Sequence, residues 1–166
     1  LTDGVYTEGH FWTQASTVGW QNSQPVIITL DLGREQAIRG VSYHTAAGVA
    51  GVEWPIAVYV FVAGEDRRFR ESGELVTLST PRGLPAADQY ATYRYWTDAL
   101  QTHGRYVAMT VWQQPFIFCD EIEIYAGDAA WLETPPPGEA VADIKAFTER
   151  IAVREAVKRR FRTDIR

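Results

Sequence analysis

The sequence predicts an all-β antiparallel sandwich followed by a C-terminal α-helix. Short runs rich in β-branched and aromatic residues recur through the first 125 residues, with turns but no helical pattern between them. Three consecutive prolines at 135–137 then favour a stiff, extended linker. Beyond residue 139, apolar residues recur at three- and four-residue steps, and neither Pro nor Gly interrupts them. The chain therefore divides into a sandwich at 1–127, a Pro-rich linker at 128–138 and an amphipathic helix at 139–166.

Each expected strand is a short apolar or alternating run bounded by turn residues. The strongest of them, Ile-Ala-Val-Tyr-Val-Phe-Val at 56–62, is closed by Gly-Glu-Asp at 64–66. The full set of expected strands covers residues 26–32, 38–44, 56–62, 90–96, 105–112, 116–118 and 121–125.

The expected helix has one apolar stripe that would face water if the helix stood alone. The stripe consists of Val141, Ile144, Phe147, Ile151, Val157, Phe161 and Ile165. The stripe must pack against the sandwich, against a partner helix or against a further domain. We expect a further domain, because the sequence starts at Leu1, holds its only methionine at Met109 and so resembles a piece of a longer chain.

Composition excludes several classes of protein. With 46% hydrophobic and 22% charged residues the chain is too apolar to be disordered, and no apolar run approaches the length of a membrane span. Residues 1–138 carry 16 acidic and 8 basic side chains, whereas residues 139–166 carry 5 and 8. An acidic body without lysine argues against binding to nucleic acid or to an anionic membrane.

Catalytic patterns are missing from the sequence. The three histidines, His10, His44 and His103, have no metal-ligand spacing, and Cys119 lies in an expected strand, where a small buried side chain is typical. The sequence contains no Gly-x-Ser-x-Gly elbow and no phosphate-binding loop before a helix. We therefore expect this chain not to be an enzyme.

Five motifs, in this order, resemble the discoidin domain, also called the coagulation factor five/eight C-type domain. They are Leu-Thr-Asp-Gly at 1–4, Val-Gly-Trp at 18–20, Ile-Thr-Leu-Asp-Leu-Gly at 28–33, Arg-Tyr-Val at 105–107 and Asp-Glu-Ile-Glu-Ile-Tyr at 120–125. Bacterial members include the family 32 carbohydrate-binding modules. The resemblance implies a jelly-roll sandwich with galactose-binding-like topology, a binding face at one end, and an extracellular, periplasmic or cell-surface location.

The resemblance also implies roles for individual residues. Members often hold one structural calcium ion, and the matching carboxylates here are Asp3 and Glu121; the alternative is that Asp3 shapes a turn and Glu121 lies on a polar strand face. Trp20 matches a core tryptophan. Arg105 matches a structural arginine, for which we expect an internal ion pair or contacts with carbonyl groups.

The first candidate ligand-binding segment starts at His44, where relatives often place a ligand-contacting histidine, and runs through a loop rich in small residues. Glu53 and Trp54 end this loop, so an imidazole, a carboxylate and an indole could together hold a sugar. The alternative is that His44 bonds a loop carbonyl and Trp54 caps the end of the sandwich. Trp12 could bind ligand or be structural.

The second candidate segment precedes the last strands, and the family topology would place it at the same end. Its aromatic rings could form a platform and its amides could bond hydroxyl groups. The residues are Trp112, Gln113, Gln114 and Phe116.

These features predict a non-catalytic carbohydrate-binding module that targets a larger secreted or surface protein, such as a glycoside hydrolase or polysaccharide lyase, to a glycan or polysaccharide. The alternative is a protein-interaction domain that docks on a neighbouring domain. Residues 45–52 favour this alternative, since they contain neither the Arg nor the Asn found in the family's sugar sites.

Overall fold

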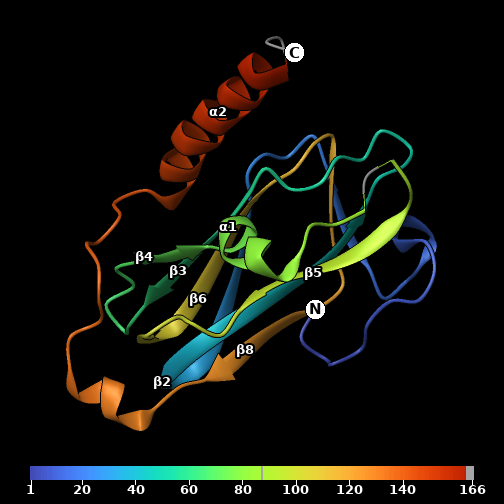
Figure 1. Cartoon of the computed structure of the whole chain (residues 1–166). Helices are drawn as coiled ribbons and strands as arrows, with labels where there is room; N and C mark the ends of the chain where they lie inside the picture. Colours follow the sequence, from blue (N-terminus) through green and yellow to red (C-terminus); the bar gives the residue numbers. More distant parts are fainter. Residues whose placement is uncertain (87, 164–166) are drawn as a thin grey trace.

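The computed structural model is an antiparallel β-sandwich with a C-terminal helix, as predicted (Figure 1). It describes the backbone of residues 1–86 and 88–163, and the side chains of these ranges as far as Arg154. Eight strands occur in these residues. They are β1 (Val18–Gln21), β2 (Val26–Ala47), β3 (Ala57–Ala63), β4 (Arg70–Glu74), β5 (Ala91–Thr97), β6 (Thr102–Trp112), β7 (Phe116–Cys119) and β8 (Ile122–Ala126).

Strand β2 belongs to both layers of the sandwich. Its first part pairs with β6 from Val26 to Asp31, which extends the order β4-β3-β6-β2. After an irregularity between Asp31 and Gln36, its second part pairs with β5 on one side and β8 on the other. The short strands β1 and β7 pair separately. One continuous strand therefore replaces the two that the sequence predicts at 26–32 and 38–44.

The main core lies between the two layers. Val58, Val60 and Met109 come from the layer of β3 and β6, and Tyr43 and Ile122 come from the layer of β2 and β8; all are at most 2% exposed. Trp20 packs partly buried against this cluster, in agreement with its expected structural role. Burial of apolar surface on this scale supplies the main driving force for folding.

Helix α2 (Ile144–Thr163) starts later than the expected helix, because residues 139–143 run extended and Ala140 bridges to Arg70. The first part of its apolar stripe covers the outer face of β3 and β6. There Ile144, Phe147 and Ile151 pack against Tyr59, Phe61, Ala57 and Ala108. Val157, Phe161 and Ile165 lie outside the described side chains. The sandwich is one of the three surfaces that the sequence leaves open for burial of the apolar stripe.

Four short helical segments were not expected from the sequence, and one of them is the 3-10 helix η2 (Thr80–Arg82). Helix α1 (Leu75–Ser79) is capped by Glu74, whose carboxylate accepts hydrogen bonds from the N–H groups of Val76 and Thr77. The 3-10 helix η1 (Phe11–Thr13) lies in the first loop, and η3 (Ala129–Glu133) lies within the expected linker. Among the described residues, no helix combines the length and the hydropathy that crossing a membrane requires.

Candidate functional site

Loops from four parts of the chain meet at one end of the sandwich. The two predicted ligand-binding segments lie side by side there. The Glu53 N–H donates to the Gln114 carbonyl at 2.9 Å, and Gln113 Nε2 donates to the Glu53 carbonyl at 2.9 Å. The loop after β2 also packs tightly on the segment before β5, since a Cβ on Gly48 would overlap the Gln89 carbonyl.

A hollow of about 300 Å³ opens between these loops. Two exposed carboxylates, Glu53 and Asp88, line it together with the indole of Trp54. Gly48 and Gly51 line it as well, with φ of +98° and +74°, a region that favours glycine. Carboxylates accept hydrogen bonds from hydroxyl groups, and small residues let a ligand reach the backbone, so the hollow suits a polar ligand of modest size.

A group of three aromatic side chains, two of them exposed, lies at the same end of the sandwich. The imidazole of His10 lies 4.2 Å from the ring of Tyr90 and 5.4 Å from that of Trp12, which is 37% exposed. Tyr90 ties the group to the first loop, because its hydroxyl donates to the Gly9 carbonyl at 2.6 Å and accepts from the Phe11 N–H at 3.2 Å. Tyr90 also packs on the buried cluster that contains Val52, next to the hollow.

The structure places His44 inside the protein rather than on this surface. The His44 side chain is 9% exposed, and its Nδ1 lies 2.7 Å from Oδ1 of Asp120, whose other oxygen accepts from the Thr7 N–H. Burial alone would raise the pKa of Asp120, but the hydrogen bonds from His44 and Thr7 hold it below its usual value. The aromatic rings of Tyr6 and Phe11 enclose the imidazole.

The other predicted ligand-binding residues divide into two groups. Glu53, Trp54 and Gln114 reach the surface at the loop end, although Trp54 also donates from Nε1 to the Ala86 carbonyl at 3.0 Å. Gln113 is fully buried and holds the two loops together. Phe116 packs on the buried cluster of Phe11 and Phe118, and Trp112 packs towards α2, away from the hollow.

Three members of the site, His10, Tyr90 and Asp88, were not singled out from the sequence. Asp88 lies 35 positions after Glu53, so only the folded loops bring the two carboxylates to one hollow. The available signal was the sequence His-Phe-Trp at 10–12, a dense aromatic run within a loop.

The two predicted calcium ligands, Asp3 and Glu121, lie next to each other in the fold, where the N-terminal segment meets the chain just before β8. Glu121 is 2% exposed, and its Oε2 accepts from the Asp3 N–H at 3.2 Å. Burial and the nearby carboxyl group of Asp3 raise the pKa of Glu121, whereas the Val5 N–H and the hydrogen bond with Glu121 lower the pKa of Asp3. Two adjacent carboxyl groups supply oxygen atoms of the kind that a calcium ion binds.

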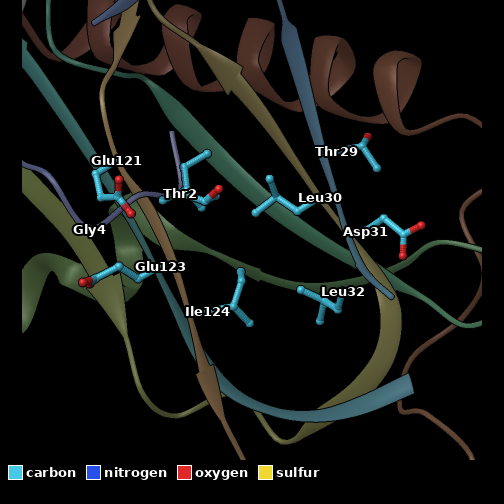
Figure 2. A pocket seen from close by; sticks show the side chains of 10 residues that line it. Thr2, Gly4, Thr29, Leu30, Asp31, Leu32, Glu121, Glu123 and Ile124 are labelled. Carbon is cyan, nitrogen blue, oxygen red and sulfur yellow. The ribbon is translucent and has the colours of Figure 1, made fainter. Parts of the chain in front are cut away.

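Glu121 also lines a groove of about 510 Å³ on the open side of the sandwich, between β2 and β8 (Figure 2). Figure 2 shows Glu121 beside Thr2 and Gly4, with Leu30, Leu32 and Ile124 further along the groove. The described residues contain no cluster of three or more His, Cys, Asp or Glu side chains that could hold a metal ion. A calcium ion at Asp3 and Glu121 would thus depend on backbone carbonyls for its remaining ligands, which calcium accepts.

Comparison with known proteins gives structural matches only. No protein-family model matches the sequence, and no curated protein matches it. The structure is similar to CpGH89CBM32-6 of Clostridium perfringens, with 14% identity and a TM-score of 0.45 over 67% of this chain and 76% of that one. It is also similar to CpGH89CBM32-5 of the same organism, solved in complex with GalNAc-β-1,3-galactose, with 18% identity and a TM-score of 0.44 over 61% and 66%.

Proposed function

We propose that this chain is a non-catalytic carbohydrate-binding module whose binding surface is the loop end of the sandwich. One observation carries the proposal. A hollow with two exposed carboxylates, Glu53 and Asp88, lies at the same end of the sandwich as the exposed rings of His10 and Trp12 and the partly buried ring of Tyr90. Sugars present hydroxyl groups and C–H-rich faces together, so this pairing of acceptors and rings matches their chemistry.

The module would act by raising the local concentration of a larger secreted or cell-surface protein on a glycan or polysaccharide. The hollow is small and open to water, and sugars are well hydrated, so single-site binding would be weak. Weak binding suffices for targeting, since repeated contacts along a polymer add avidity.

A glycan array followed by affinity electrophoresis tests the proposal. We expect the double variant Glu53→Gln/Asp88→Asn and the single variant Trp12→Ala each to lose at least about tenfold in affinity, because they remove acceptors or a ring while leaving the fold intact. The matched control is Glu133→Gln, an exposed carboxylate in η3, at the opposite end of the molecule from these loops (Figure 1). Unchanged binding in both loop-end variants would contradict the proposed site, and no binding to any glycan would favour the protein-interaction alternative.

We further propose that Asp3 and Glu121 hold one calcium ion that fastens the N-terminal segment to the chain just before β8. The support is the paired carboxyl groups, one of them buried, with opposite pKa shifts. The role would be structural, because Glu121 lines a groove that is separate from the loop-end hollow.

A further inference from the structure

A second hollow of about 200 Å³ shares Trp54 with the first. The rings of Trp54, Tyr93 and Tyr95 form one part of it, and the side chains of Val76, Leu84 and Pro85 form the other. Glu53, Trp54 and Pro55 are consecutive, so the chain passes directly from the carboxylate-lined hollow into this one. We name the second hollow the aromatic niche.

The polar ends of two niche rings are already bonded to the protein. Trp54 Nε1 donates to the Ala86 carbonyl at 3.0 Å, and the Tyr93 hydroxyl donates to the Gly83 carbonyl at 2.8 Å. These bonds fix the loop at 83–86 over the rings and use up both donors. What Trp54 and Tyr93 offer a ligand is therefore ring surface, which favours an apolar occupant.

The geometry of the rings indicates the kind of occupant. Trp54 and Tyr93 lie edge to face with centroids 6.2 Å apart, and Tyr93 and Tyr95 do so at 4.7 Å. A further flat ring can extend this arrangement with the same edge-to-face contacts. A volume of about 200 Å³ holds one six-membered ring with its substituents, whereas a water molecule takes about 30 Å³. Leu84 is 74% exposed at the rim, so the niche is open to solvent.

We propose that the aromatic niche receives an aromatic substituent attached to the sugar that occupies the neighbouring hollow, so that the preferred ligands are glycans carrying an aryl or phenolic acyl group. The inference rests on the proposed function and assigns a substrate class to the same surface. Trp54 lies between the two parts of such a ligand, with the sugar on one side and the aromatic group on the other.

Isothermal titration with two matched ligand series tests this assignment. The series are the methyl and the p-nitrophenyl glycosides of D-glucose, D-galactose, D-xylose and D-mannose. For at least one sugar, the p-nitrophenyl glycoside should bind roughly tenfold more tightly than the methyl glycoside, because the niche buries the added ring. In Leu84→Asp, which places a charge at the exposed rim, this preference should vanish while methyl glycoside binding persists.

Leu132→Asp is the matched control. Leu132 is an exposed leucine in η3, 41% accessible and distant from the niche, so the same substitution there should keep the preference. Equal binding of the two series would contradict the proposed occupant of the niche and leave the proposed function intact. A preference for p-nitrophenyl glycosides that Leu84→Asp does not change would do the same. Free p-nitrophenol binding as tightly as its glycosides would also overturn the inference, because the sugar would then contribute nothing. Failure of both series to bind would overturn the inference, whereas the proposed function is decided by the glycan array.

Discussion

At the scale of single residues, His44 shows how the environment decides the role of a side chain. The sequence places a histidine at the end of a strand that leads into the candidate binding loop, which predicts either ligand contact or a hydrogen bond inside the protein. In the structure, the imidazole bonds the carboxylate of Asp120, which also accepts from Thr7. Through these bonds, Asp120 connects Thr7 of the first loop and His44 of β2 to the chain just before β8. Removal of one partner would leave a buried group without its hydrogen bond, which would destabilise this connection.

Arg105 offers a residue-scale prediction with a defined pH range. Its guanidinium binds both carboxylate oxygens of Asp31, at 2.7 and 2.8 Å, and also Glu65 at 3.1 Å, so it forms an ion pair as expected, but at the surface rather than inside the protein. The hydrogen bond from Arg105 lowers the pKa of Asp31 to about 2. The unfolded value is about 3.9, so this pair stabilises the fold above pH ~4 and loses its effect as the pH falls towards 2.

In Arg105→Met, the pKa of Asp31 should rise towards its ordinary value, and the stability lost between pH 4 and pH 2 should become smaller. Carboxyl-carbon NMR titration of Asp31 measures the first effect, and urea unfolding at each pH measures the second. Arg68→Met is the control, since Arg68 reaches only its own neighbour Asp66, at 4.0 Å, with both side chains exposed. If the pKa of Asp31 stays near 2 in Arg105→Met, the hydrogen bond from the Gly33 N–H is sufficient to lower it without Arg105.

At the scale of elements, the sequence predicts strands better than their connections. Five of the seven expected strands are found as separate strands, within one or two residues at most boundaries, because their apolar runs and turns are strong local signals. The continuity of β2 was not predictable, since Leu-Gly-Arg-Glu at 32–35 reads as a turn. In the structure Gly33 has φ of +78°, and the strand resumes its pairing with β6 at Gln36 after a register shift. β1, β4 and α1 are four or five residues long and depend on tertiary contacts rather than on local pattern.

The loop after β2 yields an element-scale prediction. Gly48 has φ of +98°, and a Cβ there would overlap the Gln89 carbonyl, so Gly48→Ala must displace the loop that lines the carboxylate hollow. We expect a loss of roughly 2 kcal/mol or more in unfolding free energy, from the strained φ and the clash together, and weaker glycan binding.

Gly51→Ala is the matched control in the same loop. Gly51 also has a positive φ, of +74°, but a Cβ there meets nothing within 4 Å, so only the backbone strain of about 1 kcal/mol applies. Urea unfolding and affinity electrophoresis compare the two variants. Equal losses in both would show that close packing on Gln89 does not position the hollow.

Helix α2 provides the second prediction at this scale. The Phe147 ring lies 5.5 Å from each of the rings of Tyr59 and Phe61, nearly perpendicular to both. Phe147→Ala should lower the unfolding free energy by about 2–3 kcal/mol, which is less than for a fully buried ring because Phe147 is only half-buried. Hydrogen exchange should also become faster along α2.

Val153→Ala is the control, at a position 52% exposed on the same helix. It should change the unfolding free energy by less than about 0.5 kcal/mol. Similar effects of the two variants would mean that α2 does not pack on β3 and β6 in solution.

At the scale of the whole molecule, the candidate site depends on how distant loops meet. The sequence identifies Glu53 and Trp54 and places their loop beside that of Gln114, because the order of motifs implies the topology. It cannot identify Asp88 or Tyr90 as members of the same surface, since no local pattern encodes that the segment before β5 packs on Gly48. The same limit explains why Trp112 and Gln113 were wrongly expected on the loop surface. Side chains alternate between the two faces of a strand, and at the end of β6 this places Trp112 against the cluster of β3 and β6 and buries Gln113.

Calcium binding is a whole-molecule prediction, because its proposed ligands join the first residues of the chain to the segment that leads into β8. The Ile122 N–H donates to the Leu1 carbonyl at 2.7 Å, and Glu121 accepts from Asp3, so this junction closes one side of the sandwich. A ligand that binds only the folded state stabilises it by about 2.7 kcal/mol at 100 times its dissociation constant. For a chain of this size, that corresponds to a rise in Tm of roughly 5–10 °C.

Differential scanning calorimetry with 5 mM CaCl₂ against 5 mM EDTA measures this rise. In Glu121→Gln the rise should disappear, because the amide loses the charge that a divalent cation requires, whereas Glu133→Gln should keep it. Magnesium at the same concentration should give a smaller rise, since it demands a stricter octahedral geometry than two carboxylates and backbone carbonyls supply. If calcium leaves the Tm of the unaltered protein unchanged, or raises it equally in Glu121→Gln, the proposed calcium site is wrong.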